Sequence, residues 1–222
     1  VYREPQLNKN GSRTVSVSLE GSRLCFQTAP NQETDLQVAT WGLSPPMPGS
    51  APDAKRNLQL TIESEELESF FRSLDEKNQQ VAADNSVEWF KKSLDKDAIS
   101  QMYVPLVKPG KDGGKPMVTM KVKVNEPATK VYVVQGNDTS SLKYSEGGQD
   151  DITRGSKVLA MVETTGLWFM PRQFGMAFTV KEMFVWKHQS SKRGPEAFSL
   201  SANTKVMRVE ASSDIASADI AS

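Results

Sequence analysis

The sequence is poor in the residues on which most enzymes and metal sites depend. It has 1 cysteine, Cys25, and 1 histidine, His188, which excludes an intramolecular disulfide, a multi-cysteine metal site and multi-histidine metal chemistry. Its apolar runs are far shorter than the roughly 20 residues that a membrane-spanning helix needs. No charged-then-apolar leader pattern stands at its beginning. We therefore expect an intracellular protein that is neither secreted nor bound to a membrane.

Catalytic motifs are equally scarce. His188 ends a strand pattern and has no nucleophile-elbow motif beside it. The Gly-rich loop 109–116 (PGKDGGKP) lacks the spacing of a phosphate-binding loop, and Pro116 stands where that loop needs Ser or Thr. The neighbouring carboxylates Asp150 and Asp151 would not face each other on a regular element, which disfavours an acid–base pair. We expect no enzyme activity, no cofactor and no metal.

Charge is balanced in total but not along the chain. The sequence has 27 Lys+Arg and 27 Asp+Glu. Residues 61–100 hold 5 basic and 10 acidic residues (net −5), residues 101–209 hold 16 basic and 9 acidic (net +7), and residues 210–222 hold 3 acidic and no basic (net −3). Local fields decide what binds where. The uneven charge indicates a basic binding region, with ordinary surface variation as the alternative.

Hydrophobic periodicity predicts strands, then helices, then strands. Residues 13–27 and 57–62 alternate polar and apolar, whereas the apolar residues after the N-cap candidate Ser64 follow helical spacing. Strand patterns return from residue 117 almost to 187, interrupted by a polar loop at 136–156. This order favours a mainly β (β-rich α+β) fold: an antiparallel barrel or sandwich with a helical insertion around residues 64–103.

The chain length predicts one domain, residues 1–209, followed by a flexible tail at 210–222. The last residues, SSDIASADIAS, have too little apolar content to pack.

Aromatic and basic side chains interleave along the later strands. Flat rings stack on unpaired bases, and Lys and Arg neutralise phosphates. The even-numbered residues of Phe174 to Val180 are expected in the core, and one ring of Trp168-Phe169 must point outward in a regular strand. The alternative is that all these rings fill the barrel. The candidate nucleic-acid-binding residues are Lys121, Lys123, Lys130, Tyr132, Trp168, Arg172, Lys181, Trp186 and Lys187.

Three short segments have a recognisable pattern: LDEKN at 74–78, MYVPLV at 102–107 and GLWF at 166–169. Together with the basic Gly-rich loop and the lysine-alternating strand after it, residues 55–187 resemble the single-stranded DNA-binding proteins of nucleo-cytoplasmic large DNA viruses. That family is similar to the single-stranded DNA-binding protein of T-seven-like bacteriophages.

The resemblance implies an oligonucleotide-binding (OB) fold that coats single-stranded DNA without sequence preference in DNA replication, recombination or repair. It places the protein in the nucleus or at the viral replication site of an infected host cell. It also implies an acidic C-terminal tail that binds replication proteins such as a polymerase, helicase or primase. This tail departs from the pattern, with three acids and the ending Ile220-Ala221-Ser222.

A viral structural protein, such as a capsid-associated β-domain, is the alternative function. The sequence leaves the oligomeric state open, a homodimer included, as well as the preference for DNA or RNA.

Overall fold

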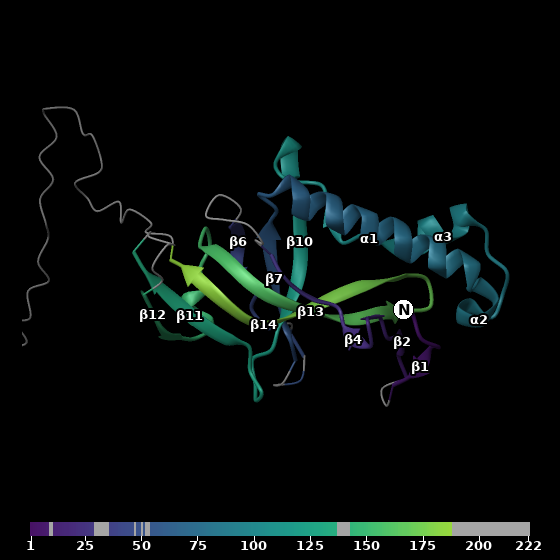
Figure 1. Ribbon diagram of the computed structural model, residues 1–222, viewed down its shortest axis with the longest axis horizontal. Coiled ribbons are helices and arrows are strands. Elements are labelled where there is room, and N and C mark those ends of the chain that lie inside the picture. Colours follow the sequence, from purple (N-terminus) through teal and green to yellow (C-terminus); the bar gives the residue numbers. More distant parts are fainter. Residues whose placement is uncertain are drawn as a thin grey trace, which may run out of the picture. The chain divides into compact units, whose positions relative to one another are not determined.

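Two long strands, β13 (Lys157–Phe169) and β14 (Phe174–Trp186), form an antiparallel hairpin around which the other strands assemble (Figure 1). The computed structural model describes residues 1–8, 11–28, 36–46, 48, 49, 51, 54–136 and 143–187. They belong to one compact unit, Val1–His188. His188 itself and the predicted tail, 210–222, lie outside the described residues.

The other strands are shorter. Those before the helices are β1 (Gln6–Leu7), β2 (Arg13–Val15), β3 (Ser18–Leu19), β4 (Ser22–Arg23), β5 (Cys25–Gln27), β6 (Gln37–Leu43) and β7 (Arg56–Thr61). Those between the helices and the hairpin are β8 (Tyr103–Val104), β9 (Val107–Lys108), β10 (Met117–Val122), β11 (Lys130–Gln135) and β12 (Lys143–Gly147). The segment 13–27, predicted to be extended, thus divides into four short strands.

Five strands form a partly closed ring. β13 pairs with β6, β6 with β7, β7 with β10, β10 with β14, and β14 pairs back with β13. The β13–β6 and β10–β14 contacts are short, with two residue pairs each. The predicted mainly β fold with a helical insertion is confirmed.

The sheet is mixed: most of its strand pairings are antiparallel, as predicted, and three are parallel. β14 pairs in parallel with β8, β10 and β11, because the chain re-enters the sheet at β14 in the direction of those strands. The prediction of a loop at 136–156 is wrong in part. Lys143–Gly147 form β12, and Gln149–Asp151 form the 3-10 turn η3. All five residues of β12 are exposed, so its sequence lacks the alternation of apolar and polar residues that predicts a strand.

The ring encloses the core. Met120 and Val122 of β10 and Phe178 of β14 are fully buried. The predicted core position of the even-numbered residues 174–180 is confirmed, since each is at most 5% exposed. Because side chains alternate across a strand, the residues between them, such as Lys121 and Thr179, lie on the outer face.

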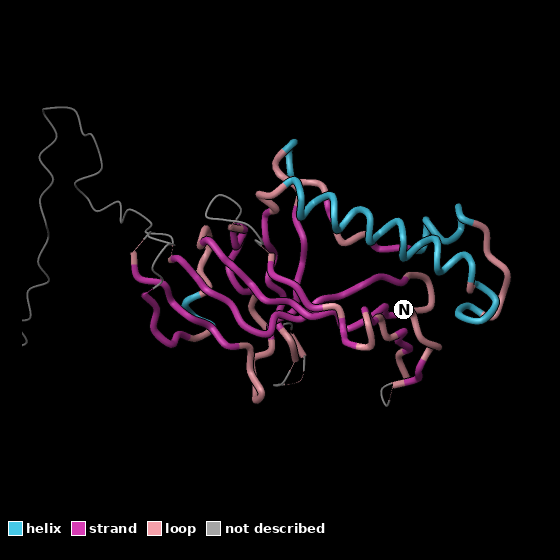
Figure 2. Tube along the Cα trace, viewed as in Figure 1, coloured by secondary structure: helices cyan, strands magenta, loops and turns pink. Residues whose placement is uncertain are grey.

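The predicted helical segment comprises α1 (Glu65–Asp84), α2 (Ser86–Phe90) and α3 (Lys96–Met102). α1 begins where the sequence indicated, because the Ser64 hydroxyl accepts a hydrogen bond from the Leu67 amide at 3.3 Å. The helices lie over one half of the long hairpin, and β11 and β12 flank its other half (Figures 1 and 2). None of the helices within the described ranges is long and apolar enough to cross a membrane.

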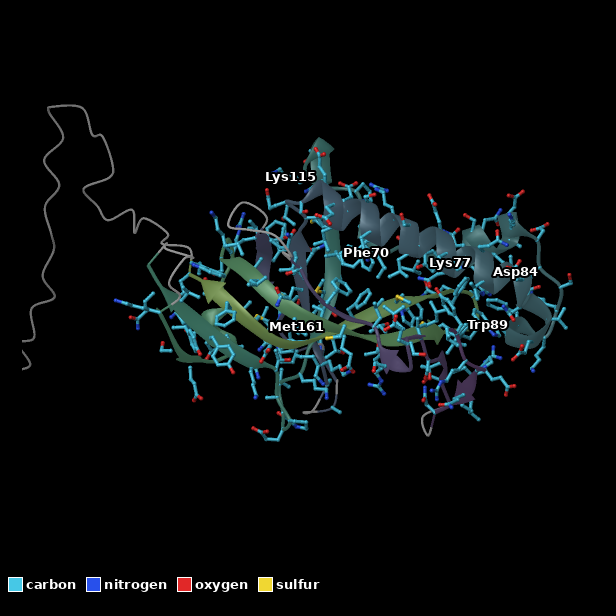
Figure 3. All side chains as sticks on the ribbon, in the orientation of Figure 1. Phe70, Lys77, Asp84, Trp89, Lys115 and Met161 are labelled. Carbon is cyan, nitrogen blue, oxygen red and sulfur yellow. The ribbon has the colours of Figure 1, made fainter. Side chains whose placement is uncertain are left out.

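Aromatic rings fix α1 to the sheet. Phe26 of β5 contacts Phe70 and Phe71 of α1, with ring centroids 5.0 and 5.9 Å apart, and Phe178 of β14 at 5.4 Å. Phe70 lies on the sheet side of the helix (Figure 3). The hydrophobic effect therefore supplies this attachment.

A buried polar network joins α1 to the segment after α3. Asp75 accepts hydrogen bonds from the Tyr103 hydroxyl at 2.6 Å and from the Leu106 amide at 3.0 Å. Asn78 donates to the Tyr103 hydroxyl at 2.9 Å and accepts from the Tyr2 hydroxyl at 2.7 Å. These residues explain two of the recognised sequence segments: LDEKN supplies the carboxylate and amide, and MYVPLV supplies their partners.

Candidate nucleic-acid interface

Five cationic side chains gather on the outer face of the ring around Thr179 of β14. We call them the cationic cluster: Arg23, Lys55, Lys121, Lys123 and Lys181. The ammonium of Lys55 donates to the Thr179 hydroxyl at 3.2 Å. Thr179 is the register partner of Lys121 on β10 and of Glu163 on β13. Since adjacent strands lie about 4.8 Å apart, these charges occupy a small area.

Holding these cations together disfavours their charged forms. Burial lowers the pKa of Lys55, and the charges of Lys123, Lys121 and Arg23 lower it further. Burial also lowers the pKa of Lys121, whose ammonium donates to the Asn57 side chain at 2.7 Å. Like charges held this close destabilise their own ionised forms. An anion placed among them would relieve that cost.

One carboxylate lies within the cluster. Glu163 accepts from the Arg23 guanidinium at 3.0 Å and forms an ion pair with the Lys181 ammonium at 3.5 Å. The hydrogen bond from Arg23 is the main reason that the pKa of Glu163 is lowered. Lys181 reaches Glu163 from a β-bulge, because Met161 and Val162 pair with Glu182 and Val180 and leave Lys181 as the extra residue.

Three aromatic rings follow on the same face. We call Tyr132, Tyr144 and Phe184 the aromatic cluster, and each pair of its ring centroids is 5.3 Å apart. Tyr132 and Phe184 are register partners on β11 and β14. Tyr144 of β12 is 54% exposed, so its ring has free surface. Met161 of β13, labelled in Figure 3, lies in the row that pairs with Glu182, next to this cluster.

Strand β14 connects the two clusters. Its outer face carries Thr179 and Lys181, and then Phe184. Five residues of extended chain span about 17 Å. Phosphate-neutralising and base-stacking groups therefore lie within about 17 Å along one strand.

The model of a protein family of unknown function, DUF5871, matches residues 51–201. The chain belongs to DUF5871. The matched region contains every member of the two clusters except Arg23. No curated protein matches the DUF5871 chain.

Three solved structures are similar to the DUF5871 chain in fold. The single-stranded DNA-binding protein gp2.5 of bacteriophage T7 is 12% identical, with a TM-score of 0.47, and the match covers 84% of this chain and 100% of gp2.5. The C-terminally truncated single-stranded DNA-binding protein of bacteriophage Enc34 is 10% identical, with a TM-score of 0.40 and coverage of 85% and 92%. The Enc34 protein in complex with single-stranded DNA is 10% identical, with a TM-score of 0.42 and coverage of 84% and 92%. The phage protein named in the resemblance above is thus among these structures. The resemblance to the proteins of large DNA viruses stays a prediction.

The fold brings five of the nine predicted residues of the DUF5871 chain to this surface. Lys121, Lys123 and Lys181 belong to the cationic cluster, and Tyr132 belongs to the aromatic cluster. Lys130 is exposed at the start of β11, where its register partner on β14 is Glu182.

Two predicted residues lie at the far end of the hairpin. Trp168 is half-buried, whereas Phe169 is 6% exposed, so one ring of the pair points outward as predicted. The Trp168 ring covers Gly175, where an added Cβ would come within 3.0 Å of Trp168 Cζ2. Arg172 is exposed in the turn between β13 and β14. Since β14 spans 13 residues, both lie distant from the aromatic cluster.

The last two predicted residues are engaged elsewhere. Trp186 is 8% exposed and packs with Leu36 and Val134, and its indole nitrogen has no hydrogen-bond partner among the described residues. Packing of this kind leaves the ring little surface for stacking. The Lys187 ammonium pairs with the Asp151 carboxylate at 2.6 Å.

Four residues of the two clusters were not among those predicted from the sequence: Arg23, Lys55, Tyr144 and Phe184. Lys55 precedes β7 in an irregular stretch, and Tyr144 lies in the segment predicted to be a loop. Only the pairing of Val134 with Tyr144 brings that ring beside Tyr132. Phe184 carried a usable signal, because it alternates with the buried Met183 and Val185.

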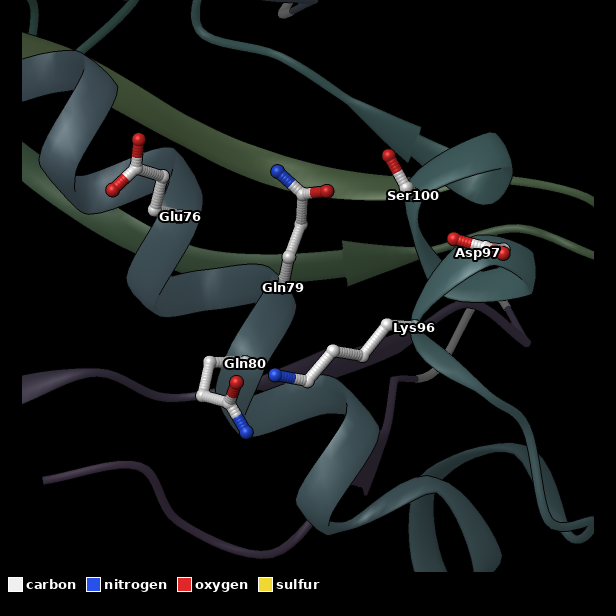
Figure 4. Close-up of a pocket in the computed structure, with 6 residues that line it drawn as sticks. All are labelled: Glu76, Gln79, Gln80, Lys96, Asp97 and Ser100. Carbon is white, nitrogen blue, oxygen red and sulfur yellow. The ribbon is translucent and has the colours of Figure 1, made fainter.

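A separate small cavity of about 270 Å³ lies between α1 and α3 (Figure 4). No aromatic side chain is among the residues that line it: Glu76, Gln79, Gln80, Lys96, Asp97 and Ser100. Within the described ranges, no group of three or more His, Cys, Asp and Glu side chains is arranged to hold a metal ion.

Proposed function

We propose that the protein binds single-stranded DNA without sequence preference and without catalysis, coating unpaired strands during replication, recombination or repair. The observation that carries the proposal is the row of groups on β14: the cationic cluster around Thr179 and the aromatic cluster around Phe184 share one outer face. Action at a viral replication site, and contact with replication proteins through the tail, belong to the same proposal.

Phosphates would supply the negative charge that the cationic cluster lacks. Five cations surround Thr179, and Glu163 is the carboxylate that pairs with two of them. A single strand carries a phosphate at every nucleotide, and its neutralisation releases bound counterions. Burial is the main cause of the lowered pKa of Lys55, and binding would relieve the repulsion from neighbouring cations that lowers it further. The proposed affinity therefore depends strongly on salt.

The aromatic cluster favours unpaired bases over a duplex. A ring stacks only on a base whose face is free, and each such stack contributes on the order of 1–3 kcal/mol. Tyr144 has exposed ring surface, and its neighbours Tyr132 and Phe184 hold it in place by edge and tilted contacts. Stacking tolerates any base, so the proposed binding is independent of sequence.

The test is fluorescence anisotropy on labelled oligo(dT) and on a duplex of equal length, over a range of salt. We expect tighter binding to oligo(dT) and a linear fall of log affinity with log salt. The double variant Lys121→Gln, Lys123→Gln should reduce the steepness of that fall by about 1.4, which is about 0.7 for each lost cation.

The matched control is Lys91→Gln, Lys92→Gln, which removes two exposed cations beside α2. It should bind as the unaltered protein does. Equal, weak binding of the unaltered protein to oligo(dT) and duplex would refute the proposed function.

A further inference from the structure

We infer that Trp41 and Arg154 form a further stacking site for one unpaired base, outside both clusters. The inference rests on the proposed function and extends the path of the bound strand to β6.

Trp41 exposes a large aromatic surface. Its side chain is 60% exposed, whereas Trp89 and Trp186 are 2% and 8% exposed. The guanidinium carbon of Arg154 lies 4.8 Å from the centre of the Trp41 ring, within the roughly 6 Å of a cation–π contact. One cation therefore orients the ring while leaving surface free for a flat ligand.

The backbone builds this pair. β6 bulges between Ala39 and Leu43, and Trp41 lies inside the bulge. The Ala39 amide donates to the Ser156 carbonyl and the Ala39 carbonyl accepts from the Gly155 amide, both at 2.8 Å. The Leu43 amide donates to the Ile152 carbonyl at 3.1 Å. The segment 152–156, which carries Arg154, is thus bonded on both sides of Trp41.

Gly42 makes the close approach of the two segments feasible. Its φ is +74°, and an added Cβ would lie 2.8 Å from the Ile152 carbonyl oxygen and 3.1 Å from the Arg154 amide nitrogen. Glycine adopts this conformation without strain and leaves that space free. Bulges commonly re-aim a side chain at a functional site, and this one turns an indole outward beside a fixed cation.

The surroundings fit a single base better than a protein surface. Protein partners usually dock on contiguous apolar patches. The other large apolar side chains that are exposed lie on neither β6, β7 nor the segment 152–156 in the described chain: Val1, Leu7, Leu19, Phe70, Val87, Tyr144 and Met170. An isolated ring with a guanidinium over it matches one flat base and its phosphate.

A bound strand can pass from the cationic cluster to Trp41. The Ser44 amide, three residues after Trp41, donates to the Asn57 carbonyl at 2.9 Å. The Asn57 side chain accepts from Lys121 of the cluster at 2.7 Å. The path runs about 10 Å along the chain from Trp41 to Ser44 and then crosses two strand spacings, to β7 and to β10, which is roughly 20 Å in all.

Tryptophan fluorescence tests the inference apart from binding. Oligo(dT) is titrated into the unaltered protein, Trp41→Phe and the control Trp168→Phe, and quenching and anisotropy are recorded together. Trp41→Phe should lose more than half of the quenching while anisotropy still reports binding, because phenylalanine still stacks. Trp168→Phe should keep more than half of the quenching.

Trp41→Ala measures the contribution of the ring to affinity. We expect binding weaker by about tenfold, since each base stack contributes on the order of 1–3 kcal/mol. Its melting temperature should be unchanged because the side chain is exposed. Arg154→Gln should weaken binding by about threefold.

The outcomes separate the two proposals. If the unaltered protein binds oligo(dT) but Trp41→Phe keeps more than half of the quenching, or Trp41→Ala binds as tightly as the unaltered protein, the stacking site is refuted and the proposed function stands. If anisotropy shows no binding by the unaltered protein, both are refuted.

Discussion

The helical segment and the outer face of the ring use polar side chains in opposite ways. Around α1, Asp75 and Asn78 are buried, and each is satisfied by partners from distant parts of the chain. Around Thr179, cations crowd together, and burial and mutual repulsion lower the pKa of Lys55. Satisfied buried groups hold a fold together, whereas crowded charges of one sign weaken it.

This difference separates stability from binding. Substitutions in the polar network should change the free energy of unfolding and leave the affinity of the folded protein for DNA intact. Substitutions on the outer face should change the affinity for DNA much more than the free energy of unfolding.

The largest effect is expected from Asp75→Ala. It leaves the Tyr103 hydroxyl and the Leu106 amide without their buried acceptor, and should lower the free energy of unfolding by about 3 kcal/mol. Urea denaturation measures the loss, with Glu76→Ala, its exposed neighbour on α1, as the control. An Asp75→Ala protein as stable as the control would show that the network does not hold the helices.

Tyr144→Ala addresses the other region. Loss of a stacking ring should weaken oligo(dT) binding by about tenfold, because a base stack contributes on the order of 1–3 kcal/mol. The melting temperature should change little, since Tyr144 is 54% exposed. Tyr144→Phe keeps the ring and should bind normally. A fall in stability without a fall in affinity would move Tyr144 from the binding surface to the structural part of the molecule.

The pH dependence of stability sharpens the comparison. Burial raises the pKa of Asp75, although hydrogen bonds from Tyr103 and Leu106 oppose the shift. The folded protein therefore holds this proton more tightly than the unfolded chain, whose aspartates titrate near pH ~3.9. The stability that this tightly held proton contributes is complete below that pH and is lost as pH rises through the raised pKa, with a slope of at most about 1.4 kcal/mol per pH unit.

Urea denaturation between pH 4 and 7 measures this slope, and Asp75→Asn, which cannot titrate, supplies the reference. Subtracting the two curves removes the other carboxylates. A difference that does not vary with pH would contradict the raised pKa.

The smallest effect is expected from Glu163→Gln. The change releases Arg23 and Lys181 from their carboxylate and should strengthen oligo(dT) binding by about threefold at low salt, because exposed ion pairs are weak. The gain should vanish at high salt, where exposed charges are screened. Weaker binding would instead indicate that Glu163 holds Arg23 and Lys181 in their binding positions.

The elements with regular periodicity could be predicted from the sequence. The alternation along β10 and β14 predicted both the core and the outward direction of Lys121, Lys123 and Lys181. The spacing after Ser64 predicted α1. Such patterns record which face of an element is buried.

What the sequence could not show depends on pairing between distant segments. Tyr144 joins the aromatic cluster because β12 pairs with β11. Lys55 joins the cationic cluster because its side chain reaches Thr179. Trp186 alternates as an outward residue yet is covered by Leu36 and Val134. Burial of an outer face by another part of the chain leaves no periodic signal.

The position of β14 inside the sheet has a further consequence. It is hydrogen-bonded along both edges, by β13 on one side and by β10, β11 and β8 on the other. Amides in a strand paired on both sides resist local opening, so we expect their exchange with deuterium to be among the slowest in the chain. The strand under both clusters is thus rigid before any ligand arrives, and an incoming oligonucleotide would lose little free energy to ordering the protein.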